Sequence, residues 1–202
     1  MKTLLRIDAS ARRSESYSRR LGDHFETSWR STYPEGVVLT RDLALDPPPH
    51  LTDETIRIFV GEGSVGGAAG ADLSESLIDE MRKADEVLIC SPIYNFGMPS
   101  TLKAYVDHVV RYGYTFTQDE KGFHGMLNTK AAWLLTAQGG MARFGVPDFQ
   151  APALGAVLKH MSVANIHHIA LEGTVYPDGA LGERLAGALA GIDRWFNLAE
   201  KA

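Results

Sequence analysis

Cysteine is scarce in this chain, because Cys90 is the only one among 202 residues. A lone cysteine excludes an intramolecular disulfide and leaves no partner for a cysteine-rich zinc site. An excess of basic residues is also missing, since 20 basic and 25 acidic side chains give a net charge of −5. Nucleic-acid-binding proteins usually carry a basic face, so this balance argues against a nucleic-acid partner.

Long apolar runs are missing as well. No stretch of the sequence approaches the roughly 18 apolar residues of a membrane-spanning helix, and residues 1–6 do not read as a signal peptide. We therefore expect no membrane partner and a cytoplasmic protein. The sequence shows no internal repeat, no metal-ligand spacing and no nucleophile-elbow motif. With 45% apolar and 22% charged residues, residues 1–202 are expected to form one domain with a sizeable core.

Five short runs of apolar and β-branched residues punctuate the chain, and helix-like segments separate them. The runs are Thr3–Asp8, Val37–Thr40, Glu86–Cys90, Ala131–Thr136 and Ile166–Leu171. Alternating strands and helices predict a parallel sheet with helices on both faces. The expected fold class is therefore a doubly wound α/β fold, with five strands in the flavodoxin-like order 2-1-3-4-5. In such a sheet the ligand binds at the switch point between strands one and three.

Apolar residues at helical spacing mark the connecting helices. Leu21, Phe25 and Trp29 define the first helix, and Ser100 is expected to cap a helix that runs to Val110. His108 on that helix is expected at the surface. The remaining helical segments are the stripe of Leu73, Leu77 and Met81, residues 150–162 and residues 179–198.

A stiff loop with two prolines and a glycine follows the third strand. Ile93, Tyr94, Asn95 and Phe96 lie in it, at the carboxyl end of a central strand. Two aromatic rings that flank one amide suit a flat, apolar ligand that also forms hydrogen bonds. Because ligands bind at this edge of an open α/β sheet, Tyr94, Asn95 and Phe96 are candidates for holding a ring such as a flavin.

Serine hydroxyls crowd the loop after the first strand and lead directly into a helix. Ser10, Ser14, Ser16 and Ser18, with Tyr17 among them, lie where free amides and the helix dipole favour a phosphate. The alternative is that these serines only cap the helix. Arg12 and Arg13 could add positive charge to a phosphate site, or could be solvated loop residues.

The loop after the fourth strand reads Ala137, Gln138, Gly139 and Gly140. Paired glycines let the backbone approach a ligand and Gln138 can donate or accept, although an ordinary glycine turn is the alternative. A long irregular segment, residues 141–152, follows and places Phe144 where a substrate wall is expected. His160, near the end of the next helix, is assigned with Phe144 to the substrate pocket and not to catalysis.

Two other motifs carry less weight. Residues 61–66 match G-x-G-x-x-G, but they do not follow the strand that opens a βαβ unit, so a dinucleotide fingerprint is not favoured. Residues 61–70 are instead expected to form a mobile surface loop. His167 and His168 lie on opposite faces of a strand and therefore cannot bind one metal from one side.

Across nearly its whole length the chain resembles the FMN-dependent NADH-azoreductases, also described as FMN-dependent NADH:quinone oxidoreductases. The most specific segment is Pro92 to Phe96, followed by a helix that begins at Pro99-Ser100 and includes Leu102-Lys103. Corroborating segments are Ser10, Ser16 to Ser18, Arg41-Asp42-Leu43, Gly139-Gly140 and Glu172-Gly173. The sequence departs from the family pattern at Ala137-Gln138 and at residues 159–162, which puts the preferred substrate in doubt.

The resemblance implies a flavodoxin-like homodimer with one FMN per subunit. Ser10 and Ser16 to Ser18 would bind the phosphate, Ile93 to Phe96 the flavin ring, and Ala137 to Gly140 its polar edge. It also implies ping-pong, two-electron hydride transfer from NADH or NADPH to quinones or azo compounds. The flavin carries this chemistry, so no catalytic side chain is expected. The alternatives are a flavodoxin-type electron carrier, an FMN reductase and a doubly wound domain that binds no flavin.

Overall fold

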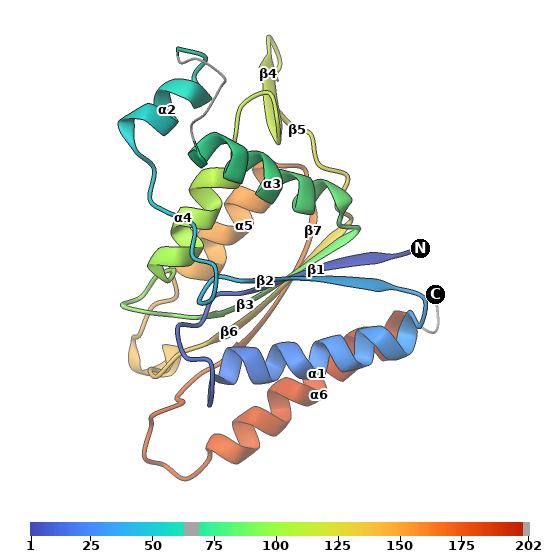
Figure 1. The fold of residues 1–202 in the computed structure, drawn as a ribbon. Coiled ribbons are helices and arrows are strands. Elements are labelled where there is room, and N and C mark those ends of the chain that lie inside the picture. Colours follow the sequence, from blue (N-terminus) through green and yellow to red (C-terminus); the bar gives the residue numbers. More distant parts are fainter. Residues whose placement is uncertain (63–68, 200–202) are drawn as a thin grey trace.

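The structure, a computed structural model, describes residues 1–62 and 69–199 (Figure 1). The expected surface loop at 61–70 and the G-x-G-x-x-G match at 61–66 fall mostly on residues 63–68, which lie outside the described residues. None of the described helices has the length and apolar character that a membrane crossing requires.

Five parallel strands form the central sheet in the order β2-β1-β3-β6-β7. Their bounds are β1 Thr3–Asp8, β2 Val37–Asp42, β3 Glu86–Pro92, β6 Ala131–Ala137 and β7 Asn165–Leu171. The five-stranded parallel sheet predicted from the sequence is therefore confirmed. The strands labelled β6 and β7 are the fourth and fifth of this sheet, because β4 (Phe116–Asp119) and β5 (Gly122–Gly125) form a separate antiparallel hairpin.

Helices cover both faces of the sheet (Figure 1). One face carries α1 (Tyr17–Thr32) and α6 (Leu181–Ala199), and the other carries α3 (Ala69–Lys83), α4 (Ser100–Val109) and α5 (Gln150–His160). A short helix, α2 (Asp53–Phe59), lies beyond α3 and α4. Each layer has its own apolar core, and successive residues of the central strands alternate between them. In β1, for example, Leu4 packs with α1 and α6, whereas Leu5 packs on the opposite side.

The predicted stripe of the first helix is correct, because Leu21, Phe25 and Trp29 of α1 are fully buried. Two local predictions are wrong. His108 is buried rather than at the surface, with Nε2 3.0 Å from the carbonyl oxygen of Pro49 and its ring against Phe59 of α2. Ser100 is the first helical residue rather than the cap, because Pro99 occupies the cap position without a side-chain hydrogen bond.

The arrangement of connections positions the ligand edge. From the carboxyl end of β1 the chain passes to α1 on one face, and from the end of the neighbouring β3 it passes to α4 on the other (Figure 1). The two loops therefore diverge and leave a crevice between them, as expected at a topological switch point.

Candidate functional site

The loop after β1 brings serine hydroxyls to the start of α1. Ser16 caps this helix, since its Oγ accepts from the Arg19 amide at 3.5 Å, and it lies 3.2 Å from Ser18 Oγ. Ser10, almost fully buried, accepts from the Arg12 amide at 3.2 Å. Ser16 is thus a helix cap, as the alternative interpretation holds, whereas Ser10 accepts its hydrogen bond within the loop. The same hydroxyls also stand beside the free amides of a helix N-terminus, where a phosphate binds well.

Arg19 fixes this loop, and the sequence analysis did not identify it. Its guanidinium donates to both Asp42 carboxylate oxygens at 2.7 Å, and to the backbone carbonyls of Ser10 (2.9 Å) and Arg12 (3.1 Å). These hydrogen bonds hold the pKa of the Asp42 carboxyl below its ordinary value. Arg19 therefore ties the serine loop to the end of β2 through a planar fork that lysine could not replace.

A buried arginine lies beneath this loop. Arg6 of β1 forms ion pairs with Asp8 (3.0 Å), Asp23 (2.7 Å) and Glu26 (3.0 Å). Cys90 lies beside them, fully buried, and burial raises the pKa of its thiol well above the ordinary value. Cys90 is therefore an unreactive core thiol.

The loop after β3 forms a tight turn at residues 94–97. Tyr94 and Gly97 exchange backbone hydrogen bonds of 3.1 and 3.0 Å, while Asn95 and Phe96 have positive φ angles of 49° and 68°. Two positive φ angles at the central positions define a type I′ turn, which normally contains glycine. A phenylalanine in this conformation is strained, and such strain concentrates at functional sites. Phe96 is 52% exposed, so packing of its side chain in the core does not explain the strained backbone.

Gln150, the first residue of α5, supports this turn from below and was not identified from the sequence. It is fully buried. When its amide is oriented so that the oxygen accepts from Ser91 Oγ at 3.1 Å, its nitrogen donates to the carbonyls of Pro92 (3.0 Å) and Gly97 (3.1 Å). The hydrogen-bond network assigns this orientation. The turn is therefore held by a side chain that lies more than 50 residues away in sequence.

The loop after β6 packs against the loop after β7. The Gln138 side chain donates to Glu172 Oε1 at 3.1 Å, and the Thr174 amide donates to the Gln138 carbonyl at 3.0 Å. Close packing explains the glycine at position 140, because a Cβ there would lie 2.7 Å from the Val146 side chain. The buried Oε1 of Gln138 has no hydrogen-bond partner among the described residues. Such an unpaired acceptor is expected to be satisfied by water or a ligand.

A cleft of about 200 Å³ joins these loops. Eight of the predicted cofactor-binding residues line it: Ser10, Ser16, Tyr17, Ser18, Ile93, Tyr94, Ala137 and Gly139. Asn95, Phe96, Gln138 and Gly140 neighbour them in the chain but do not line it. Thr174 and Val175 form the facing wall and were not predicted, because only the resemblance had pointed to the adjoining Glu172-Gly173.

The two residues predicted for the substrate pocket lie far from each other. Phe144 is at the ligand edge, on the short 3₁₀ helix η1 (Ala142–Phe144), and its ring stacks on Tyr176 with centroids 5.1 Å apart. His160 ends α5, roughly 15 Å of helix from the residues at its start. Its ring contacts Phe116 and Phe123 of the hairpin, with centroids 4.3 and 5.2 Å away. Within one subunit the structure therefore does not bring His160 to the cleft.

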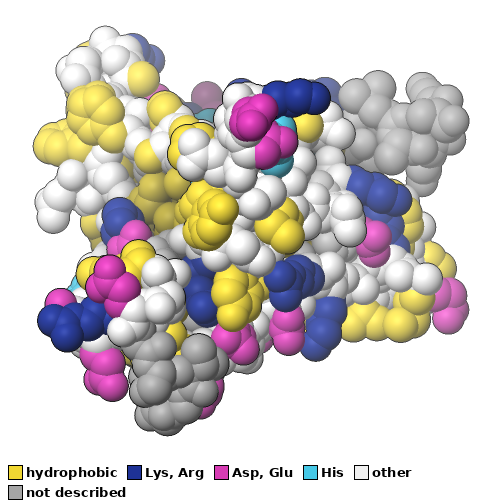
Figure 2. All heavy atoms as spheres, turned by 90° about the horizontal axis from the view of Figure 1, so that it is seen from above, with side chains coloured by type: hydrophobic (Ala, Val, Ile, Leu, Met, Phe, Trp, Pro, Cys, Tyr) yellow, Lys and Arg dark blue, Asp and Glu magenta, His cyan; other side chains and the backbone are white. Residues whose placement is uncertain are grey.

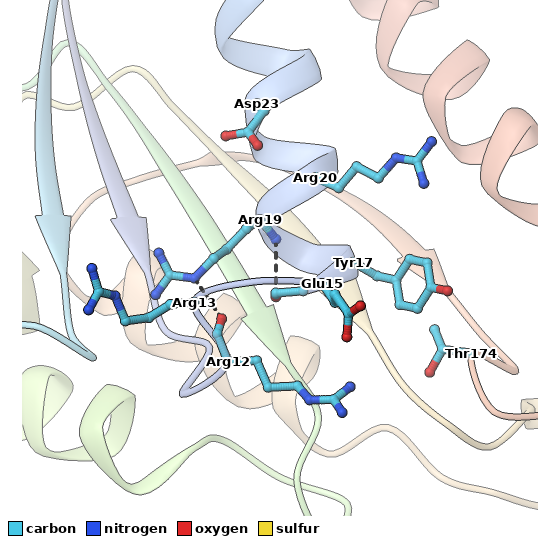
Figure 3. A pocket seen from close by; sticks show the side chains of 9 residues that line it. Arg12, Arg13, Glu15, Tyr17, Arg19, Arg20, Asp23 and Thr174 are labelled. Atoms are coloured by element: carbon cyan, nitrogen blue, oxygen red, sulfur yellow. Dashed lines mark hydrogen bonds between the residues drawn. The ribbon is translucent and has the colours of Figure 1, made fainter.

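A larger hollow of about 580 Å³ continues from the cleft along the start of α1, and Figure 3 shows the side chains that line it. Tyr17 and Thr174 stand close to each other at its border with the cleft. Residues 1–62 and 69–199 hold no group of three or more His, Cys, Asp or Glu side chains that could bind a metal ion.

Comparisons with known proteins agree with this geometry. A family model described as a flavodoxin-like fold matches residues 1–195. An FMN-dependent NADH:quinone oxidoreductase of Xanthobacter autotrophicus is 51% identical over 142 residues, which cover 69% of this chain and 68% of that protein. One from Hydrogenovibrio crunogenus is 36% identical over 194 residues, covering 93% and 96%.

Solved structures show the same fold. An azoreductase from Bacillus anthracis str. Sterne superposes with a TM-score of 0.87 at 21% identity, covering 98% of this chain and 99% of that one. An FMN-dependent NADH-azoreductase from Bacillus anthracis str. Ames Ancestor, solved in complex with FMN, has a TM-score of 0.84 at 20% identity, again covering 98% and 99%.

Proposed function

The chain belongs to the flavodoxin-like family of FMN-dependent NADH:quinone oxidoreductases, and we propose that it uses FMN and NADH to reduce quinones and azo compounds. The single observation that carries this at the site is the cleft at the switch point, where hydroxyls at a helix N-terminus face an aromatic turn. A phosphate-bearing flat ring is the ligand that such a cleft suits.

The residues of the cleft fit FMN. Ser10, Ser16 and Ser18 present hydroxyls where the phosphate would sit, and Arg19 keeps their loop in place. Ile93 to Phe96 would run along the flavin ring, with the Asn95 amide as a hydrogen-bond partner. The unpaired Oε1 of Gln138 could accept a hydrogen bond at the polar edge of the ring. All twelve predicted cofactor-binding residues stay in the proposal on these grounds.

Bound FMN would supply two-electron hydride transfer between the nicotinamide and the acceptor. The protein contributes binding, orientation and shielding from water. Tyr94, Phe96 and Phe144 are exposed aromatic rings around the ligand edge, and we place donor and acceptor in turn against them, as ping-pong exchange requires. Amide donors around Asn95 would stabilise negative charge that develops on the ring. No side-chain acid or base is assigned, because the flavin carries the chemistry.

We further propose that residues 1–202 are a single FMN-binding domain that works as a homodimer. The sheet draws its strands from the whole chain, from β1 to β7. Large apolar side chains lie exposed on and beside the hairpin, including Tyr112 (58%), Phe123 (60%) and Met126 (45%). Figure 2 shows apolar side chains scattered among charged ones on the face seen from above in Figure 1. A second copy could cover such a surface and bring His160 near the partner's cleft.

A reaction that consumes NADH belongs where nicotinamide dinucleotides circulate, so the cytoplasm remains the expected location.

The test begins with the absorption spectrum of the purified protein reconstituted with FMN. We expect a yellow protein that releases FMN rather than FAD on denaturation, is bleached by NADH without oxygen, and regains colour when a quinone is added. Steady consumption of NADH with quinone separates an enzyme from an electron carrier. A protein that retains no flavin after reconstitution, or that NADH does not bleach, contradicts the proposal.

A further inference from the structure

The hollow beside the cleft carries an unusual set of charges. Its walls are the loop after β1, the first two turns of α1 and Thr174. The residues that line both the hollow and the cleft are Arg12, Glu15, Ser16, Tyr17 and Thr174. Arg13 and Arg20 line the hollow but not the cleft. The two spaces therefore adjoin: one set of side chains lines both, and another set lines the hollow alone.

Two of the six charged side chains that line the hollow form ion pairs within the described part of the chain, and four do not. Arg19 pairs with Asp42, and Asp23 pairs with Arg6. Arg12, Arg13 and Arg20 have no acidic partner within 4 Å anywhere in residues 1–62 or 69–199. Among the other arginines of this part of the chain, only Arg194 of α6 also lacks such a partner. The fourth unpaired charge is Glu15, which opposes the three arginines and also lines the cleft.

Such a cluster needs an explanation in a chain with a net charge of −5. Like charges that line one concavity repel each other, and the concave shape concentrates their potential on whatever enters. Figure 3 shows Arg12 and Arg20 reaching out on either side of Tyr17, while Arg13 extends beyond Arg19. Guanidinium groups bind phosphate oxygens through paired, charge-assisted hydrogen bonds.

We propose that this hollow is a second anion-binding site, which takes a phosphate-type group of a ligand that binds together with FMN. The phosphate of FMN itself is assigned to the serine hydroxyls of the cleft, which Arg13 and Arg20 do not line. A volume of about 580 Å³ is within the usual range for small-molecule pockets and exceeds what a single ion occupies. The diphosphate of the dinucleotide electron donor has the required charge; naming that source rests on the proposed function, whereas the anion site itself does not.

The experiment measures binding of pyrophosphate and of ADP to the FMN-loaded protein by calorimetry at low ionic strength. We expect Arg20→Ala to weaken binding of both probes roughly tenfold, the loss of about one charge-assisted hydrogen bond, and Glu15→Gln to strengthen it. Arg194→Ala is the matched control, because it removes an arginine that also lacks an acidic partner but lies outside the hollow. FMN affinity, measured by flavin fluorescence, should stay within about twofold in Arg20→Ala.

Competition identifies the source of the anion. Probes that raise the KM for NADH assign the site to the electron donor, and probes that bind without affecting it assign the site to a separate phosphorylated ligand. Absence of probe binding, equal effects of Arg20→Ala and Arg194→Ala, or an equal loss of FMN affinity in Arg20→Ala would overturn the proposal. If the protein holds no FMN, its spectrum shows that beforehand, and the same titrations on the flavin-free protein still test the anion site.

Discussion

Individual hydroxyl groups, rather than lysine charges, are what this chain offers to a phosphate. Ser16 and Ser18 lie 3.2 Å apart at the start of α1, but their surroundings differ, since Ser18 is fully buried and Ser16 is not. A carboxylate at position 18 would disturb the core, so a loss of FMN affinity could not be separated from a loss of stability. Position 16 tolerates aspartate, which is itself a good helix cap, so it provides the cleaner test.

We therefore predict that Ser16→Asp weakens FMN binding roughly 100-fold while the melting temperature is preserved. The carboxylate replaces a donor by a repelling charge, and a loss of about 2.7 kcal/mol corresponds to this factor. Titration of the FMN-free protein measures it. Ser14→Asp is the control, because Ser14 is exposed and outside both spaces. Equal affinities of the two variants would place the phosphate elsewhere.

Arg19 acts on the ligand indirectly, through the loop that it holds. We predict that Arg19→Lys, which keeps the charge but loses the planar fork, weakens FMN binding roughly 10-fold because the Ser10 and Arg12 carbonyls are no longer held. Fluorescence titration gives the affinity, and differential scanning calorimetry reports any general loss of stability. The control is Arg30→Lys. Arg30 is exposed and pairs with Glu26 on the same helix, so this change should leave the FMN affinity unchanged.

Two histidines of β7 make stability depend on pH. Burial lowers the pKa of His167, which stacks on Trp133 at 4.2 Å, and of His168, which contacts Thr136. The unfolded chain then binds protons more readily than the folded chain, so stability falls as the pH drops through the ordinary histidine value of 6.5. Carboxyls with lowered pKa, such as Asp42, act at lower pH.

We expect the urea midpoint to decrease from pH 7.5 to pH 5.5 and the decrease to become smaller in His167→Phe, which keeps an aromatic ring against Trp133. A midpoint that rises over the same interval would contradict the sign of the linkage.

At the scale of elements, the turn at residues 94–97 and the start of α5 form one unit. Gln150 is buried against Ser91, Pro92 and Gly97, so a side chain of equal length without hydrogen-bonding groups removes its hydrogen bonds to Ser91 Oγ and to the carbonyls of Pro92 and Gly97. We predict that Gln150→Met lowers the free energy of unfolding by about 2–4 kcal/mol and weakens FMN binding, because the turn loses its support. Gln118→Met, at an exposed position of the hairpin, should change neither quantity, as measured by urea unfolding and FMN titration. Unchanged FMN affinity in Gln150→Met would show that the turn does not depend on this amide.

The elements differ in how well the sequence predicts them. Strands such as β3 are unbroken apolar runs because both faces of the sheet are covered, and such runs are visible without any structure. The β4–β5 hairpin was missed because its strands have four residues each and only one large apolar side chain apiece. Arg19 and Gln150 were missed for another reason. Arg19 pairs with Asp42, 23 residues away, and Gln150 contacts Ser91, 59 residues away. The local spacing of residues in the sequence does not predict such contacts.

At the scale of the whole molecule, the exposed aromatic side chains beside the hairpin predict self-association. We expect a dimer whose turnover per flavin falls on dilution, because each cleft loses a wall. Phe123→Asp should shift the protein toward monomer, since it places a charge in an apolar contact, whereas Leu45→Asp, at an equally exposed position after β2, should not. Sedimentation and quinone reduction over one dilution series measure both effects. Full activity in a monomer would contradict the assignment.

Because Cys90 is buried, the native protein should react very slowly with maleimide reagents. Its only thiol is inaccessible, and burial keeps that thiol protonated. A cysteine introduced at the exposed Ser14 would consequently be the single labelled position. A fluorophore there would stand on the loop between the cleft and the solvent. No cysteine therefore has to be removed before labelling, and the fluorescence of the label can follow ligand binding at the start of α1 in real time.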